Sequence, residues 1–369
     1  MIDRILLFPY TLTLALRDLF YRKGWKKSVK APVPTVCVGN VTVGGTGKTP
    51  HTEMILRLLT ESDDWAYKNV AVLSRGYKRK SRGFQKVDRL GSADAFGDEP
   101  LQIAVKFPQV TVAVDKDRVE GCRFLTDPAQ LQTDKKARKC IDKNVPAADI
   151  IVLDDAFQYR KLKPDFSVVL VDYNRPVHKD RLLPLGGLRD LPRRLRDADV
   201  VIVSKCPQLL DAWEKQNWAK DLGVKPEKLY FTRINYQPLK PVFEEGDGRF
   251  VYSKRLILLT GIAKDGPLKR YLAGSYEIVK HLSFPDHHRF SKGDIRSILS
   301  AVKANPTAVV ATTEKDARRL LDLKDIPAEI KERLFEIPIE VDFLTPAEKE
   351  SFEKRFLDFA RNDTTCHLD

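Results

Sequence analysis

The sequence predicts an α/β protein, with a doubly wound parallel sheet in a first domain and a second, smaller α/β domain after it. Its 369 residues exceed what one hydrophobic core usually supports, which favours two domains. Short apolar runs alternate with segments of helical spacing, and this alternation is typical of a parallel sheet covered on both faces. The composition, 43% hydrophobic and 31% charged, indicates a folded chain with a substantial core.

The strands of the first domain are expected at short apolar runs, namely Thr35–Val38, Val70–Leu73, Ile150–Leu153, Val168–Val171 and Val200–Val203. The polar stretch Glu244–Gly248 indicates a turn or linker near the domain boundary. Beyond it we expect strands at Leu256–Thr260, Ala308–Ala311 and Glu336–Val341, and a helix at Pro346–Phe359. The chain therefore divides into a basic N-terminal helical segment (1–30), a larger domain (31–235) and a smaller domain that includes the C-terminal helix (236–369).

The N-terminal segment combines an apolar run with a basic cluster. The run from Ile5 to Leu16 is shorter than the roughly 20 residues of a membrane span, and no small-residue cleavage site follows it. Its apolar residues recur at helical spacing, and Pro9 suits a first helical turn. The basic residues that follow are Arg22, Lys23, Lys26, Lys27 and Lys30. Two interpretations stay open here: a helix lying in a membrane interface, and a helix docked on the protein's own core.

The overall charge is basic, with 64 Lys and Arg against 51 Asp and Glu and a net charge of +13. This charge favours anionic partners, but it does not choose among nucleic acid, acidic lipid and phosphorylated substrates. The five cysteines are scattered and form no Cys-x-x-Cys pair, which argues against a zinc or redox site. Their use predicts a reducing, cytosolic compartment.

A glycine-rich segment between an expected strand and an expected helix resembles the P-loop, whose signature is Gly-x-x-x-x-Gly-Lys-Ser/Thr. Gly47, Lys48 and Thr49 match the signature, whereas Thr42 occupies the place of its first glycine. Lys48 should reach the β- and γ-phosphates of a nucleotide, and the Thr49 hydroxyl should hold Mg²⁺. The expected phosphate-binding residues are Thr42, Val43, Gly44, Gly45, Thr46, Gly47, Lys48 and Thr49. The predicted fold thus becomes a P-loop NTPase type.

Two pairs of acidic residues could serve such a site. Asp154 and Asp155 end an apolar strand, the position from which P-loop proteins present a carboxylate to Mg²⁺, although the pair could instead cap a helix. Asp98 and Glu99 lie in the segment Gly97–Pro100, which taken alone would be a solvated turn. One of them could be a base and the other a metal ligand.

A histidine of the smaller domain could complete this arrangement. His287 lies in the segment Phe284–Phe290, from which it could reach across a cleft to a carboxylate and tune its pKa. Taken alone, the adjacent pair His287 and His288 would more often be structural. Only the combination of the two acids with the histidine indicates a catalytic site.

Seven motifs cover most of the chain, and they are Gly39–Pro50, Ser74–Tyr77, Gly97–Pro100, Leu153–Gln158, Leu182–Arg189, Phe284–His287 and Thr312–Asp316. In this order they closely resemble the tetraacyldisaccharide 4′-kinase family, lipid A biosynthetic enzymes that phosphorylate a membrane-borne disaccharide lipid with ATP. The resemblance implies a two-domain α/β kinase on the cytoplasmic face of the Gram-negative inner membrane, held there by its N-terminal helix as a peripheral or monotopic protein. It also makes Thr42 an ordinary residue of the family.

The resemblance further implies the cofactors and the roles of the acids. The cofactors would be ATP and Mg²⁺, and the acceptor would be the 4′-hydroxyl of a tetraacyldisaccharide 1-phosphate. Thr49, Glu99 and one of Asp154 and Asp155 would ligate Mg²⁺. Asp98, oriented and tuned by His287, would take the proton from the hydroxyl.

The expected partners are the lipid substrate and the anionic surface of the inner membrane, with no nucleic acid and no obligate protein partner. Because the substrate carries a phosphate at its other end, basic side chains are expected to contact it. The candidates are Arg75, Arg118 and Arg189.

Two other functions remain as alternatives. Val203–Pro207 faintly resembles the guanine-reading Asn-Lys-x-Asp loop of P-loop GTPases and metallochaperones, but Pro207 stands where the final Asp would be. The net charge of +13 would suit a nucleic-acid motor, yet neither helicase-type motifs nor an aromatic stacking platform is visible.

Overall fold

A computed structural model describes residues 2–365 of the chain, which form two compact units. Unit 1 consists of the chain up to Arg89, the segment Ile103–Ile234 and the chain from Val341 onward. Unit 2 consists of Leu90–Gln102 and Asn235–Glu340. The chain therefore crosses between the units four times, where the sequence predicted a single boundary.

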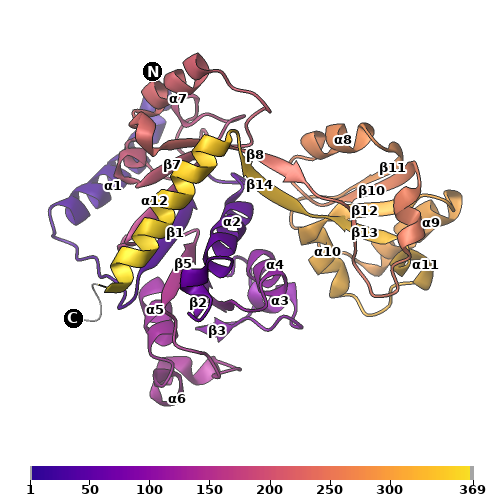
Figure 1. The fold of residues 1–369 in the computed structure, drawn as a ribbon, viewed down its shortest axis with the longest axis horizontal. Helices are drawn as coiled ribbons and strands as arrows, with labels where there is room; N and C mark the ends of the chain where they lie inside the picture. The colour runs from indigo at the N-terminus through magenta and orange to yellow at the C-terminus, as the bar shows by residue number, and fades with distance from the viewer. Residues whose placement is uncertain (1, 366–369) are drawn as a thin grey trace. The chain divides into compact units, whose positions relative to one another are not determined.

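Unit 1 is built on a nine-stranded sheet, in the order β14-β8-β7-β6-β1-β5-β2-β4-β3 (Figure 1). β1 lies between β5 and β6 and is parallel to both. The strands are β1 (Thr35–Asn40), β2 (Val70–Ser74), β3 (Gln85–Lys86), β4 (Thr111–Val114), β5 (Ile150–Asp154), β6 (Phe166–Asp172), β7 (Val200–Ser204), β8 (Leu229–Tyr236) and β14 (Ile339–Phe343). All five apolar runs predicted as strands of this sheet are strands, and β1, β2, β5, β6 and β7 are buried along their whole length.

Helices cover both faces of this sheet, which confirms the predicted α/β fold class. α2 packs on β1, β2 and β5. On the other face, Cys122, Phe124 and Leu125 of α5 join a core with alternate strand residues such as Leu153 and Val169. The helices of this unit, including the carboxyl half of α4, are α1 (Ile2–Arg22), α2 (Lys48–Thr60), α4 (Asp98–Lys106), α5 (Arg118–Thr126), α6 (Gln130–Thr133), α7 (Ala212–Leu222) and α12 (Pro346–Thr365).

The N-terminal helix α1 has two apolar faces. One face packs on the core of unit 1 through buried Leu14 and half-buried Leu7 and Tyr10. The other face exposes large apolar side chains, namely Phe8, Leu12, Leu16 and Leu19, with 63%, 43%, 42% and 40% of their surface accessible. The helix is therefore docked on its own core and still presents an apolar stripe. Pro9 lies inside the helix rather than in its first turn.

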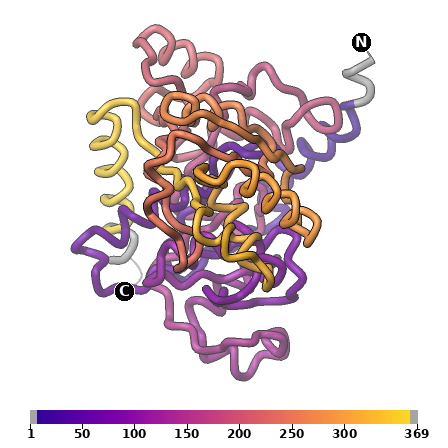
Figure 2. Tube along the Cα trace, turned by 90° about the vertical axis from the view of Figure 1, so that its right-hand side faces the viewer, coloured from indigo at the N-terminus to yellow at the C-terminus, as the bar shows by residue number. Residues whose placement is uncertain are grey.

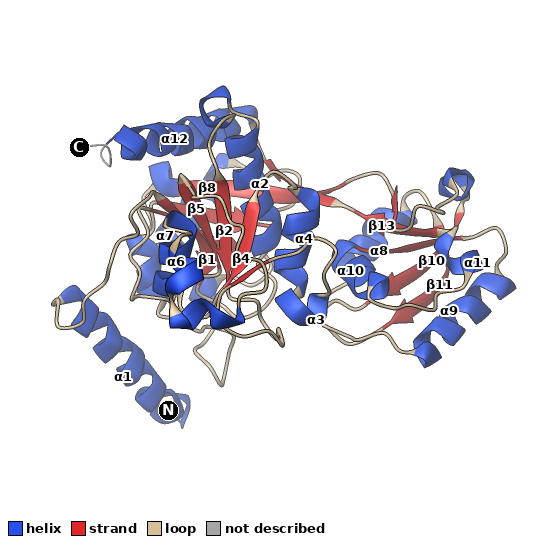
Figure 3. Ribbon diagram, turned by 90° about the horizontal axis from the view of Figure 1, so that it is seen from below, coloured by secondary structure: helices blue, strands red, loops and turns tan. Residues whose placement is uncertain are grey.

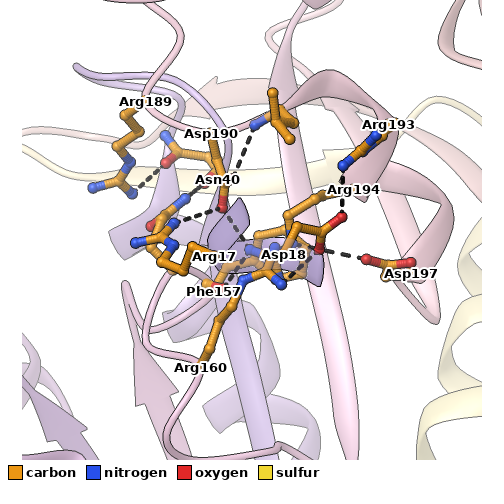
Figure 4. A network of polar contacts seen from close by, with 12 residues as sticks. Arg17, Asp18, Asn40, Phe157, Arg160, Arg189, Asp190, Arg193, Arg194 and Asp197 are labelled. Carbon is orange, nitrogen blue, oxygen red and sulfur yellow. Dashed lines mark hydrogen bonds and ion pairs between the residues drawn. The ribbon is translucent and has the colours of Figure 1, made fainter. Parts of the chain in front are cut away.

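Ion pairs hold the carboxyl-terminal part of α1 to the rest of unit 1 (Figure 4). The Asp18 carboxylate is buried and accepts hydrogen bonds from Arg160 at 2.6 Å and from Arg193 at 2.9 Å. Arg17 lies 3.7 Å from the buried carboxylate of Asp190. Burial alone would raise the pKa of Asp18, but Arg160 and the neighbouring arginines lower it, so the carboxylate stays ionised.

The C-terminal helix α12 belongs to unit 1, and its assignment to the smaller domain was wrong. Phe352 and Phe356 are fully buried, and the ring of Phe356 meets that of Phe166 in β6 at 5.9 Å. The apolar face of the helix was visible in the sequence, but the sheet that it covers was not. Figures 2 and 3 show α12 and α1 on opposite sides of unit 1.

Unit 2 carries a five-stranded sheet in the order β11-β10-β12-β13-β9, in which only β9 is antiparallel to its neighbour. One face packs on Leu268 and Leu272 of α8, and the other on Ile295 and Ile298 of α9. The strands are β9 (Lys240–Pro241), β10 (Arg255–Thr260), β11 (Glu277–Ser283), β12 (Val309–Thr313) and β13 (Leu334–Ile337). The helices of this unit are α3 (Ala93–Phe96), α8 (Gly266–Ala273), α9 (Lys292–Ala304), α10 (Glu314–Leu321) and α11 (Ala328–Lys331). The first residues of α4 also belong to it.

The segment Leu90–Gln102 corrects the predicted domains a second time, because it belongs to unit 2 and not to the larger domain. Gly97, at φ 98°, turns the chain between α3 and α4. This glycine conformation places Asp98 and Glu99 in the first turn of α4. Among the described residues, no helix combines the length and the apolar character that crossing a membrane requires.

Candidate functional site

The glycine-rich loop of unit 1 connects β1 to the start of α2, as the P-loop signature predicted. Gly44 and Gly47 have φ angles of 90° and 88°, which residues with a Cβ rarely adopt. The first N–H groups of α2 have no partner within the helix, and together with the helix dipole they make this end a binding site for an anion. Lys48 and Thr49 occupy the first two positions of the helix.

The two acids at the end of β5, Asp154 as its last residue and Asp155 directly after it, have different environments. Ser74 donates a hydrogen bond to Asp154 at 3.0 Å, and this carboxylate is buried. Asp155 instead faces cations, because Arg189 donates hydrogen bonds to both of its carboxylate oxygens and Lys48 lies 3.8 Å away. Burial opposes ionisation of Asp155, but Lys48 and then Arg189 lower its pKa. Asp155 is thus an ion-pair partner of the P-loop lysine.

Asn40, at the end of β1, connects this ion pair to the loop. Its side-chain oxygen accepts a hydrogen bond from Arg189, and its amide donates to the Thr46 hydroxyl at 2.7 Å. Gln158 donates to the backbone carbonyl of Asn40. Asn40 lies within the motif Gly39–Pro50, but the sequence predicted no role for it. Its role depends on linking Thr46 to Arg189, which is distant in the sequence.

The three arginines predicted to contact substrate differ in exposure. Arg75 is exposed directly after β2, and Arg189 is half-buried in its pair with Asp155. Arg118 is 3% exposed and donates to the backbone carbonyls of Asp115 and Lys116. Burial lowers the pKa of Arg118, while the charges of Asp154 and Asp155 partly restore it. This burial favours a supporting role for Arg118 over direct contact with a lipid.

A second group of chemically important residues lies in unit 2 and is centred on Asp98. His287 Nδ1 lies 2.9 Å from Asp98 Oδ2, which confirms that these two side chains meet. Both belong to the same unit, so the histidine does not reach Asp98 from another domain as the sequence suggested. Arg319 also donates to Oδ2, at 2.5 Å from Nη2 and 3.2 Å from Nε.

The partners of Asp98 decide its charge. Burial by itself would raise its pKa, but the hydrogen bonds from His287 and Arg319 lower it well below its ordinary value. Arg319 is in turn held by Asp316, which accepts from Arg319 Nη1 at 2.8 Å and from the backbone N–H of Gly261 at 2.8 Å. Asp98 is therefore ionised at neutral pH, and the contacts described for its carboxylate all fall on Oδ2.

Glu99, predicted as a metal ligand, forms an ion pair with Lys315, whose Nζ lies 2.5 Å from Glu99 Oε1. Burial opposes ionisation of Glu99, and Lys315 lowers its pKa. The sequence alone predicted no role for Lys315 or Arg319. The signal available was their spacing of four residues on one face of α10, with Lys315 inside the motif Thr312–Asp316 and Arg319 just after it.

Among the side chains that the structure describes, no three of His, Cys, Asp or Glu gather to form a metal site by themselves. The sequence profile of the tetraacyldisaccharide-1-P 4′-kinase family matches residues 4–359. A tetraacyldisaccharide 4′-kinase of Parabacteroides distasonis is 39% identical over 93% of this chain and 90% of its own length. The relative of the same name from Flavobacterium johnsoniae is 36% identical over 98% of both chains.

A solved structure is similar over a comparable length. The LpxK of Aquifex aeolicus, described as an "apo" form in complex with ATP, is 27% identical, with a TM-score of 0.67, over 96% of this chain and 99% of that one. The profile match covers nearly the whole chain, including the P-loop, the acids after β5 and the Asp98–His287 pair. The chain belongs to the tetraacyldisaccharide-1-P 4′-kinase family.

Proposed function

We propose that this protein transfers the γ-phosphate of ATP to the 4′-hydroxyl of a tetraacyldisaccharide 1-phosphate. The observation that carries the proposal is the presence, in one chain, of a P-loop and of an ionised, buried carboxylate held by a histidine and an arginine. Family membership supports the choice of acceptor, and the complex of the Aquifex aeolicus protein with ATP supports the choice of donor.

The residues of unit 1 suit a nucleotide phosphate. The start of α2 offers backbone N–H groups, and Lys48 adds a cation whose carboxylate partner, Asp155, is shared with Arg189. The phosphates of a nucleotide can therefore replace Asp155 as the partner of Lys48, while Arg189 continues to neutralise Asp155. Asp155 is in this proposal a partner of Lys48 rather than a metal ligand.

The donors at this edge of the sheet fit Mg²⁺, because hydroxyl and carboxylate oxygens are the ligands it prefers. Thr49 and Asp154 are the residues of unit 1 that would hold it, with Ser74 fixing one carboxylate oxygen of Asp154. Since Mg²⁺ usually keeps waters and substrate phosphates as ligands, few protein ligands suffice. Bound Mg²⁺ would neutralise charge on the phosphates. Glu99 remains a further candidate, in competition with its ion pair to Lys315.

The residues of unit 2 would move the proton. Asp98 Oδ2 is occupied by His287 and Arg319, so Oδ1 is the atom assigned to accept the proton of the 4′-hydroxyl. The 4′-oxygen forms its bond to the γ-phosphorus as the bond from that phosphorus to the β–γ bridging oxygen breaks. The proton passes to Asp98 Oδ1 late in this step, and ADP leaves. The low pKa of Asp98 makes it a weak base, which suits a late proton transfer in a reaction that depends chiefly on alignment and charge neutralisation.

We further propose that α1 rests in the membrane interface on the cytoplasmic side, where ATP and the lipid substrate are both available. Its exposed stripe of four large apolar side chains has the character of an interfacial helix. A cavity of about 610 Å³ lies at its carboxyl end, and the basic residues lining it are Arg22, Lys26, Lys27, Arg160 and Lys163. Against two lining acids, Asp18 and Asp197, these cations favour anionic headgroups.

The test is transfer of ³²P from γ-labelled ATP to a disaccharide 1-phosphate lipid dispersed in neutral detergent. Wild type should label the lipid, and Lys48→Ala and Asp98→Ala should reduce the labelling at least ~100-fold. The control is Lys228→Ala, which removes a half-buried lysine of unit 1 that donates to the carbonyl of Ala198. Full labelling by the Asp98 variant would remove the proposed base, and no labelling by wild type would refute the proposed activity.

A further inference from the structure

The carbonyls of the glycine-rich loop from Val43 to Gly47 are all hydrogen-bonded. The Gly44 carbonyl accepts from the backbone N–H of Thr46 at 2.9 Å, within the loop itself. The other carbonyls, those of Val43, Gly45, Thr46 and Gly47, accept from side chains outside the loop. We name these four donors the carbonyl collar, and they are Arg175, Lys205, Ser204 and His51.

Three collar residues come from the carboxyl ends of neighbouring strands. Arg175 follows β6 and donates to the carbonyl of Val43. Ser204, the last residue of β7, donates to Thr46 at 2.8 Å, and Lys205 after it donates to Gly45. The sheet order places β6 directly beside the strand that leads into the loop and β7 next to β6, so their ends reach its outer side.

Lys205 is held in this position by its backbone conformation and by an ion pair. Its backbone has a φ of 59°, a left-handed conformation that is uncommon for a residue with a Cβ. Its Nζ also lies 2.8 Å from the carboxylate of Asp172, at the end of β6. Such a backbone conformation persists only where surrounding contacts fix it, and it often marks a functional position.

His51 reaches the last carbonyl of the loop from within α2. Its Nδ1 lies 2.7 Å from the Gly47 carbonyl, so this nitrogen carries the proton. Nε2 must then accept, and the hydroxyl of Thr232 in β8 lies 2.9 Å from it. Both side chains are fully buried. Thr232 therefore fixes the tautomer that the loop needs.

We propose that the carbonyl collar consists of positioning residues for the nucleotide, a role that rests on the proposed kinase activity. Because each peptide is planar, a carbonyl held by a hydrogen bond fixes the orientation of the N–H group that follows it. The collar thereby keeps the loop in its phosphate-binding shape before the nucleotide arrives, which removes an ordering cost from binding. His51 acts on the carbonyl of Gly47, which has a positive φ, and Lys205 acts on the carbonyl of Gly45, the residue after Gly44.

The experiment measures binding of a non-hydrolysable ATP analogue by calorimetry, without lipid. Lys205→Met should weaken binding ~10-fold or more, since it removes a charged hydrogen bond. Lys228→Met is the matched control, because Lys228 is equally half-buried and donates to a backbone carbonyl at the opposite end of the sheet. It should bind as wild type does.

A second arm covers the possibility that Lys205→Met fails to fold. Thr232→Val should weaken binding of the analogue several-fold, while Thr232→Ser, which keeps the hydroxyl, should restore it. Wild-type affinity in both Lys205→Met and Thr232→Val, or an equal loss in Lys228→Met, would overturn the proposal. A wild type that binds the analogue but phosphorylates no lipid would refute the proposed function and leave the collar standing.

Discussion

Arg319 was not expected from the sequence, and its replacement gives the sharpest prediction about the base. Its guanidinium contacts Asp98 Oδ2 at 2.5 and 3.2 Å and Asp316 Oδ1 at 2.8 Å, and its side chain is 6% exposed. An opposite charge this close lowers the pKa of a carboxylate by roughly 1–3 units. Arg319→Met should therefore raise the pKa of Asp98 by about that amount.

The sign of the resulting pH dependence follows from the direction of the shift. In wild type the pKa of Asp98 is far below its ordinary value, so Asp98 stays ionised throughout the range from pH 5 to 9. In Arg319→Met the pKa of Asp98 should return towards the ordinary value of a carboxyl group, so a protonated and inactive fraction should appear at about pH 4 to 5. The acid limb of log kcat/KM should move upward by about 1–3 pH units.

The assay is initial-rate ³²P transfer between pH 4 and pH 9, in wild type, Arg319→Met and Arg319→Lys. Breaking a buried pair costs about 3 kcal/mol of stability, so each variant's folding is checked by circular dichroism at every pH. Arg319→Lys retains the charge and should keep most of the wild-type profile. A folded Arg319→Met enzyme whose acid limb coincides with that of wild type would refute the assignment of Asp98 as the base.

Three further predictions concern other parts of the chain. Phe356→Ala should lower the free energy of unfolding by about 3–5 kcal/mol in urea titrations, because it empties a buried site against β6, and a loss under about 1 kcal/mol would contradict that packing. His51, whose pKa burial lowers to about 4, should contribute stability above pH 6.5 that is lost towards pH 4, by up to about 3 kcal/mol. The free energy of unfolding of His51→Gln should lack this loss between pH 6.5 and pH 4. A His51→Gln curve parallel to that of wild type over this range would contradict the prediction. Leu12→Gln combined with Leu16→Gln should reduce sedimentation with phosphatidylglycerol vesicles ~10-fold without changing nucleotide affinity, whereas unchanged sedimentation would exclude the exposed stripe as a membrane contact.

The parts of the site that the sequence predicted are those encoded in short segments. The P-loop needs only the order of strand, glycines and helix, and Gly47 and Lys48 are where that order places them. Asp155 follows its strand as expected, but its partner Arg189 comes from a loop 34 residues later. Pairings of this kind depend on which strand ends become neighbours, and a single sequence does not contain that information.

The predicted domain boundaries were wrong for a related reason. The apolar face of α12 could have covered either sheet, and only the buried contact of Phe356 with Phe166 decides between them. Similarly, Gly97–Pro100 lies between segments of unit 1 in the sequence, while its acids pair with side chains from α10 of unit 2. Hydrophobic periodicity identifies elements well, but it does not state which core each element joins.

Phosphoryl transfer to one particular hydroxyl is the proposed activity, and the structure of the product decides whether it occurs. Purified protein, ATP and a tetraacyldisaccharide 1-phosphate would be incubated in neutral detergent, and the lipid product examined by ³¹P and ¹H NMR. We predict a second phosphate monoester coupled to the 4′-proton of the sugar, formed by wild type and absent with Lys48→Ala. Hydrolysis of ATP without this product, or a phosphate on any other oxygen, would contradict the proposed activity.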